Sequence, residues 1–300
     1  WEFNIRKDGI ITNSDMYGYP ASHYNVPMEA IDHIEMVRGT GSLQYGAQFG
    51  GMLNYVSKKA KKDKPFAFES INTVGSYGLL SSFNMLNGNL NKWTYSAWFA
   101  KKSLTGYRQS SDSKYNAEGI DVMYQATENL SLKIEWTHSN YLIHLAGALT
   151  DLQFKEDPKQ ASRNRNYYNP NIHIPSLQLN WKLSKNTQLN LNNSYLFGQR
   201  NSVLFDKPTN VKDSINTQTL QYNNRQVDID NFNSFTSEAR LLHHYKIGGA
   251  HSDLVTGYQL MRNDFPQRVH RILREENFPP SLMELEITET VLLDHSKQTE

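Results

Sequence analysis

Five glycines lie within thirteen residues near the N-terminal end, and glycine-rich segments of this kind often bind phosphate. They are Gly39, Gly41, Gly46, Gly50 and Gly51. A P-loop requires G-x-x-x-x-G-K-[ST], and no Lys-Ser or Lys-Thr follows the glycines at that spacing. A dinucleotide site requires G-x-G-x-x-G, and Gln44 stands at the third glycine position. The segment therefore predicts tight turns and close backbone contacts rather than a phosphate site.

The remaining reactive side chains also lack the spacing of a catalytic or metal site. His243 and His244 are adjacent in a predicted strand, so their side chains point to opposite faces and do not share a metal. The lysine-rich residues 58–64 read as a solvated connection near anionic lipid or acidic side chains. No Ser-His-Asp arrangement is recognisable, and the absence of cysteine excludes disulfides and thiolate metal sites. We expect no catalytic residue and no cofactor.

Composition narrows the class of protein further. The 300 residues carry 31 basic and 30 acidic side chains, so the net charge of +1 gives no reason to expect a nucleic-acid partner. Aromatic residues are frequent, with 17 Tyr, 13 Phe and 5 Trp. No apolar run approaches the length of a membrane helix, and no signal peptide is visible. Strands of an outer-membrane barrel would escape this test, because they alternate and are only about ten residues long.

Alternation of apolar and polar residues recurs from residue 66 to residue 260 and predicts strands with one apolar face. Clear examples are Leu130, Leu132, Ile134 and Trp136; Leu177, Leu179, Trp181 and Leu183; Leu189, Leu191, Tyr195 and Phe197; and Trp93, Tyr95, Ala97 and Phe99. Short polar turns join neighbouring strands as hairpins, whereas residues 146–175 and 205–230 are expected to be long loops. This asymmetry favours an outer-membrane barrel over the alternative, a soluble β-sandwich.

Residues 31–58, IDHIEMVRGTGSLQYGAQFGGMLNYVSK, resemble the end of the plug domain of TonB-dependent outer-membrane receptors. The shared pattern is I-E-x-x-R-G, S-x-x-Y-G and G-G-x-x-N-x-x-(S/T)-K. It is carried here by Arg38, Gly39, Gly41, Tyr45, Gly46, Gly50, Gly51 and Asn54. The resemblance covers nearly all of residues 1–58, and the strands that follow are most similar to receptors of the ferric-citrate type.

The resemblance implies a small sheet domain folded inside a barrel, where the glycines suit the confined space and Arg38 would face carboxylates. Such a receptor binds an iron chelate or similar small nutrient, and a TonB-type energy-coupling partner of the inner membrane moves the plug. Ligand contact would fall on an apical plug loop that includes Tyr17, Tyr19, His23 and Tyr24. The partner's contact segment and the first half of the plug are expected to be absent. Eight or nine strands of a barrel with about 22 are expected, so the chain reads as a fragment in contact with outer-membrane lipid.

The pattern changes near residue 264. Phe265, Val269, Ile272 and Leu273 follow a helical period, and alternation then returns in MELEIT. Residues 278–294 resemble the E-L-E-I-T-E segment of EAL domains, which hydrolyse cyclic di-GMP. The resemblance implies that Glu286 matches a metal-binding glutamate, but the other ligands of that family are missing, so no phosphodiesterase activity is expected.

The sequence thus predicts a mainly β fold: the end of a plug domain, then antiparallel strands of an incomplete outer-membrane β-barrel, with a short α/β tail. The expected domains are the C-terminal part of the plug (residues 1–58), a partial transmembrane barrel (59–264) and an EAL-like helix-strand fragment (265–300). The predicted function is that of a TonB-dependent receptor located in the outer membrane and present as a fragment of a chimera. The alternative is an inactive fragment of a cyclic di-GMP phosphodiesterase.

Overall fold

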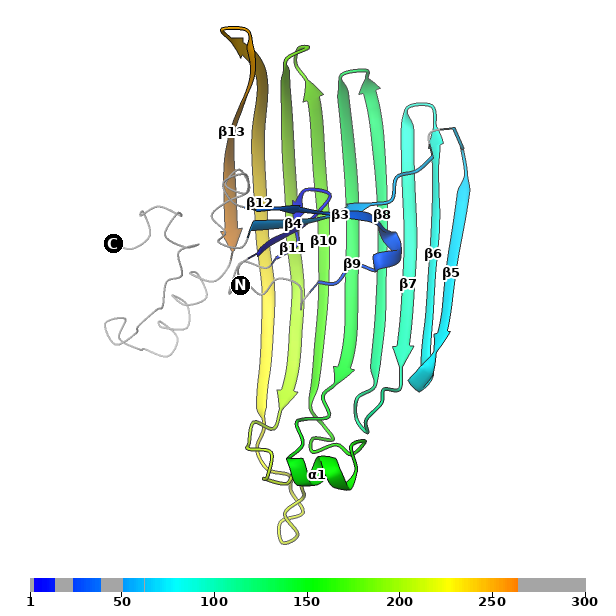
Figure 1. Cartoon of the computed structure of the whole chain (residues 1–300), viewed down its shortest axis with the longest axis vertical. Helices are drawn as coiled ribbons and strands as arrows, with labels where there is room; N and C mark the ends of the chain where they lie inside the picture. The colour runs from blue at the N-terminus through cyan, green and yellow to red at the C-terminus, as the bar shows by residue number, and fades with distance from the viewer. Residues whose placement is uncertain (1–2, 14–23, 39–50, 62, 264–300) are drawn as a thin grey trace, which may run out of the picture.

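The chain folds into two sheets of very different size. A computed structural model describes residues 3–13, 24–38, 51–61 and 63–263. The small sheet has four strands in the order β2-β1-β4-β3, and the large sheet has nine strands in sequential order from β5 to β13. Figure 1 shows the small sheet lying across the middle of the large one. The mainly β prediction is confirmed.

The strands of the small sheet are β1 (Phe3–Lys7), β2 (Ile10–Ile11), β3 (Ile31–Val37) and β4 (Gly51–Ser57). Those of the large sheet are β5 (Ala67–Gly75), β6 (Leu79–Leu90), β7 (Trp93–Leu104), β8 (Ser113–Thr127), β9 (Leu130–His144), β10 (Tyr167–Lys182), β11 (Thr187–Leu204), β12 (Gln226–Ile247) and β13 (Ala250–Asn263). The predicted plug boundary at residue 58 falls between β4 and β5. The predicted EAL-like fragment lies outside the described residues.

The large sheet is an antiparallel meander with short turns at one end and longer loops at the other. Turns of two to four residues join β6 to β7, β8 to β9, β10 to β11 and β12 to β13, at the top of Figure 1. The predicted long loops exist but are shorter than expected, because β10 begins at Tyr167 and β12 at Gln226. β10 accommodates Pro170 and Pro175, which lie within the predicted loop. Each proline lies at a gap in one of the two hydrogen-bond ladders of β10, so no neighbouring strand requires the N–H that proline lacks.

The two longest loops pack together around a buried arginine. Arg163 is 5% exposed and donates five hydrogen bonds to carbonyl oxygens, four of them in the loop between β11 and β12. The guanidinium groups of Arg163 and Arg225 lie 5.0 and 5.5 Å from the centre of the Phe205 ring. Asp213 pairs with both Arg225 and Arg165. These contacts connect the loops into one unit at the lower end of Figure 1.

Helices contribute little to the described structure. Besides the 3-10 turns η1 (Met28–Ala30) and η3 (Ser76–Gly78), α1 (Asp151–Glu156) occupies the loop between β9 and β10. The Thr150 and Gln153 side chains form a capping box that satisfies backbone N–H groups at its start. Within the described ranges, no helix has the length and apolar character needed to cross a membrane.

The predicted alternation is present, but the apolar face of the large sheet is the exposed one. On β9 and β10, Ile134 and Leu177 are 59% and 40% exposed, whereas Glu135 and Gln178 are 6% and 8% exposed. A soluble sandwich would bury the apolar face. The sandwich alternative is therefore wrong, and the polar face is the interior surface.

The small sheet packs against this interior face and supplies its apolar core. Ile10, Tyr24, Val26 and Ile31 form one cluster with Ile172, Ile174, Leu196 and Phe232 of the large sheet. On the wall itself, the Trp98 ring packs directly on the backbone of Gly119, where a Cβ atom would lie 2.5 Å from the ring. A second cluster joins Ala30 to wall residues that include Phe83, Met85 and Trp98. The interior surface thus combines polar side chains with two apolar patches, each in contact with the N-terminal segment.

Candidate functional site

The first hairpin of the small sheet contacts the interior wall and forms the candidate site. β1 and β2 are joined by Asp8 and Gly9, both with positive φ (49° and 81°), as expected for an Asp-Gly turn. The Gly9 N–H donates to Asn54 Oδ1 at 2.9 Å, and Asn54 Nδ2 donates to Glu35 at 2.8 Å. Asn54, which the plug pattern singled out, therefore supports the turn from β4.

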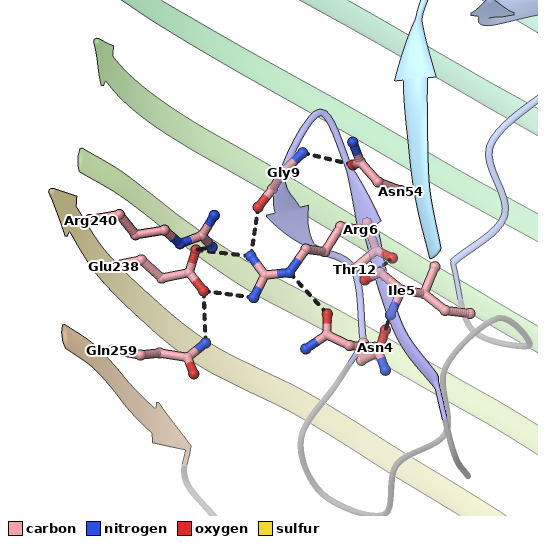
Figure 2. A network of polar contacts seen from close by, with 10 residues as sticks. Asn4, Ile5, Arg6, Gly9, Thr12, Asn54, Glu238, Arg240 and Gln259 are labelled. Carbon is pink, nitrogen blue, oxygen red and sulfur yellow. Dashed lines mark hydrogen bonds and ion pairs between the residues drawn. The ribbon is translucent and has the colours of Figure 1, made fainter. Parts of the chain in front are cut away.

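Arg6 connects this hairpin to β12. Its guanidinium is fully buried and donates to both carboxylate oxygens of Glu238, at 2.7 and 2.9 Å (Figure 2). A third bond runs to the Gly9 carbonyl at 2.7 Å. Glu238 also accepts from Arg240 at 2.6 Å and from Gln259 at 2.8 Å. This two-pronged geometry is the strongest form of a carboxylate–arginine contact, and here it is shielded from water.

Lys7 forms a second contact, with β9. Its ammonium donates to Glu135 in a short bond and lies 3.1 Å from Asp8. Lys133 lies 3.1 Å from Glu135 and 3.4 Å from Asp8, so two cations and two carboxylates alternate. All four side chains are largely buried. Because water does not solvate these buried ions, the opposite charges stabilise one another instead.

The pKa values of the hairpin groups reflect this pairing. Burial alone would lower the pKa of Lys7, but Glu135 and Asp8 outweigh it, so the pKa lies above its ordinary value. Burial alone would raise the pKa of Asp8, but Lys7, Lys133 and the Ser57 N–H hold it well below its ordinary range. Both groups are therefore charged at neutral pH.

The two contacts point in opposite directions along the wall. Arg6 and Lys7 are consecutive strand residues, so their side chains leave opposite faces of β1. One reaches β12 and the other reaches β9, while Gln178 of β10 donates to the Asp8 carbonyl at 2.8 Å. The hairpin therefore braces the wall across four neighbouring strands. Moving it requires that buried charges on both sides separate.

Several residues that the sequence singled out have a clear position. Tyr24 is 5% exposed and packs in the apolar cluster between the sheets. Gly51 has φ of +101°, and a Cβ there would lie 2.3 Å from the Val37 carbonyl, so the plug pattern needs glycine at this point. Arg38 is exposed and lies 3.0 Å from the Met36 sulfur. The described part of the chain offers it no ion pair, and Arg6 makes the carboxylate contact expected of Arg38.

Other residues from the sequence analysis lie outside the described residues. They are Tyr17, Tyr19, His23, Gly39, Gly41, Tyr45, Gly46, Gly50 and Glu286.

Between the hairpin and the loops, the interior wall carries aromatic and basic side chains that sequence reasoning missed. The Tyr141 and Tyr168 rings are 6.0 Å apart, and the Arg200 guanidinium lies 5.6 Å from the Tyr168 ring. Arg200 also pairs with Asp230. Tyr115 donates to the Asn25 carbonyl, in the segment between β2 and β3, at 2.7 Å. Their outward neighbours on the strands are mostly polar as well, so alternation does not mark these residues, and only knowledge of the interior face would have identified them. In the described ranges no group of three His, Asp or Glu side chains could hold a metal.

No protein-family model matches the chain. Among solved structures, it is similar to the ferric citrate transporter FecA in its unliganded form, with a TM-score of 0.72 and 16% identity over 87% of this chain. It is also similar to the ferripyoverdine receptor of the outer membrane of Pseudomonas aeruginosa (TM-score 0.65, 14% identity, 86% of this chain). A third is the siderophore receptor PiuA from Acinetobacter baumannii (TM-score 0.65, 15% identity, 87% of this chain).

These similarities concern the fold. The chain spans 39%, 35% and 38% of the three proteins, less than two fifths of each. Its fold is that of the corresponding part of an outer-membrane receptor barrel with a sheet held against the inner wall.

Proposed function

We propose that the chain is part of a TonB-dependent receptor of the outer membrane that takes up an iron chelate or similar small nutrient. Residues 1–58 are the end of the plug, and residues 59–264 are wall strands. The observation that carries the proposal is the buried Arg6–Glu238 contact, which holds a separate small sheet on the polar side of a wall whose other side is apolar. A wall of this kind supports residence in the outer membrane.

The nutrient would bind above the plug, on the loop side of the hairpin. Tyr115, Tyr141, Tyr168 and Arg200 supply ring faces and a cation there, which suit an anionic or aromatic iron chelate. The apical plug residues Tyr17, Tyr19, His23 and Tyr24 remain proposed contacts, although Tyr24 would have to leave its apolar cluster. Transport breaks no covalent bond in the ligand, so the proposal requires no catalytic residue and no cofactor.

Uptake would require the plug to move, and the two charged contacts would resist that movement. Separating Arg6 from Glu238 and Lys7 from Glu135 exposes buried charge on both sides. A TonB-type energy-coupling partner would supply the work. Both contacts can re-form unchanged, as a transport cycle demands.

Location and binding can be tested separately. The expressed chain should appear in outer-membrane fractions and migrate differently with and without heating. Binding of ferric citrate and of a ferric catecholate can then be followed by tryptophan fluorescence. Tyr168→Ala is expected to lower the affinity for the chelate that binds. Tyr258→Ala, on the exposed side of β13, is the matched control. Recovery in the soluble fraction would refute the location, and equal effects of the two variants would refute the binding surface.

For residues 265–300 we propose a separate origin, as an EAL-like segment joined to the receptor fragment. In the sequence, the strand pattern gives way to a helical period near residue 264. Sequencing source DNA across codons 255–275 tests this: a single continuous gene that encodes a whole barrel would refute it. Hydrolysis of cyclic di-GMP is expected to stay at the level of the blank.

A further inference from the structure

The outward face of the large sheet, opposite the small sheet, carries a row of side-chain amides that crosses four neighbouring strands at one level. They are Asn116 on β8, Asn140 on β9, Asn171 on β10 and Gln199 on β11, and each lies directly opposite the next. Tyr115 bonds to the Asn25 carbonyl on the interior side, and Ile172 packs in the interior apolar cluster. Because successive strand residues point to opposite faces, the amides next to them point outward.

The amide row lies just beyond an apolar band that begins next to the short turns. On β9 the outward residues of that band are Leu130, Leu132, Ile134 and Trp136, and Asn140 lies ten residues beyond Leu130 (140 − 130). At a rise of about 3.4 Å per residue and a tilt of about 40°, that length spans about 26 Å along the membrane normal. The apolar band of an outer-membrane barrel is about 25 Å tall. With the membrane location proposed above, the row therefore meets the headgroups of the leaflet on the loop side.

The amides of this row keep most of their hydrogen-bonding groups for a ligand or solvent. Within the residues that the structure describes, the side chains of Asn116, Asn140 and Gln199 make no hydrogen bond, and Asn171 uses only its oxygen, 2.7 Å from His138 Nε2. Each amide offers two N–H donors and an acceptor oxygen. Neighbouring strands lie about 4.8 Å apart, which is close to the length of one sugar ring. The row therefore presents donors and acceptors at the spacing of a short chain of sugars.

Two exposed lysines give the β8 end of the row a positive charge. Lys101 of β7 lies directly opposite Asn116, and Lys114 lies opposite Ser103, two residues further along each strand toward the loops. Neither ammonium group forms an ion pair in the ranges that the structure describes. The nearby acids, by contrast, each have a histidine partner: Glu118 lies 2.8 Å from His138, and Asp112 lies 3.0 Å from His144. The lysines therefore favour an anionic group next to the amide row.

We propose that this surface binds a glycolipid whose headgroup is an acylated, phosphorylated disaccharide. The amides exchange hydrogen bonds with the sugars, a phosphate accepts from Lys101 and Lys114, and the acyl chains lie along the apolar band. The three features together select this class of lipid. An anionic phospholipid would pair with the lysines but leave the amides to water, and an uncharged glycolipid would leave the lysines without an anion. This inference rests on the membrane location in the proposed function.

The test uses the full chain reconstituted in phosphatidylcholine nanodiscs that contain lipid A, dephosphorylated lipid A or phosphatidylglycerol. Lipid retained after delipidation is counted by native mass spectrometry, and lipid A should be retained over both other lipids. Asn140→Leu should lower the retention of both forms of lipid A about fivefold, the effect of one neutral hydrogen bond. Lys114→Met should lower the retention of lipid A about tenfold, the effect of one hydrogen bond to a charged group. It should leave the retention of dephosphorylated lipid A unchanged.

Two variants of the same sheet are matched controls that should not change retention. Asn193→Leu removes an outward amide within the apolar band of β11, and Lys185→Met removes an exposed lysine from the short turn between β10 and β11.

The outcomes separate the two proposals. Insertion of each variant is measured in the same samples by heat-dependent migration, and a chain that does not insert would overturn the membrane location and this site with it. An inserted chain that retains phosphatidylglycerol as well as lipid A overturns the glycolipid site alone. The same holds if Asn140→Leu has no more effect than Asn193→Leu, or Lys114→Met no more than Lys185→Met.

Discussion

Removing either partner of the Arg6–Glu238 contact should destabilise the packing of the β1–β2 hairpin on the wall, but by unequal amounts. Glu238→Met takes the carboxylate from the fully buried Arg6 guanidinium and from Arg240. Breaking a buried pair in this way costs about 3–5 kcal/mol. Arg6→Met leaves Glu238 with Arg240 and Gln259, so the cost should be nearer the ~1–3 kcal/mol of lost hydrogen bonds.

The chain contains no cysteine, which provides a direct assay. Thr12 is 4% exposed and lies between the hairpin and the wall, so a Thr12→Cys thiol reacts with a maleimide only when the hairpin opens. Because each ~1.4 kcal/mol changes the rate tenfold, Glu238→Met should label about 140- to 4,000-fold faster. Arg6→Met should accelerate labelling by about five- to a hundredfold.

A control and a double variant sharpen the result. Glu69→Met disrupts only the partly exposed Lys58–Glu69 pair and should change labelling little. Arg6→Met combined with Glu238→Met should label more slowly than Glu238→Met alone, because the unpaired guanidinium is gone. If Arg6→Met labels as fast as Glu238→Met, the additional partners of Glu238 do not determine how readily the hairpin opens.

Three further perturbations test other parts of the structure. Acid should also open the hairpin: the lowered pKa of Asp8 gives stability that is present above about pH 4 and lost below it, while the raised pKa of Lys7 preserves its contribution up to about pH 10. Labelling with dithiodipyridine, which reacts in acid, should therefore accelerate at about pH 3 relative to a free thiol, and a constant ratio would contradict the pairing. Arg163→Met removes four hydrogen bonds between the long loops and should speed their proteolysis at least about tenfold, whereas unchanged cleavage would show that the loops hold without it. Gly119→Val should lower stability by about 1–3 kcal/mol in urea melts, and Trp98→Ala should relieve much of that loss; an additive double variant would argue against the clash.

Local sequence pattern predicted most of the strands and their order. Alternation on β9, for example, correctly places Ile134 and Glu135 on opposite faces, because a strand repeats every two residues whatever surrounds it. The loop predicted over residues 146–175 was too long, and local rules could not show that Pro170 and Pro175 would each meet a gap in one ladder of β10. Pattern also could not tell which face is interior. That depends on whether the surroundings are water or lipid.

The sequence by itself determined that this protein is an alternating β chain with short turns at one end, long loops at the other and a glycine-rich segment before them. Those features follow from backbone geometry within a few residues. Only the tertiary structure decided that Arg6, 232 positions from Glu238, and Lys7, 128 positions from Glu135, make the contacts between the sheets. Pairing at such distances is set by how the sheets stack, and the burial that makes these charges matter exists only once they have stacked.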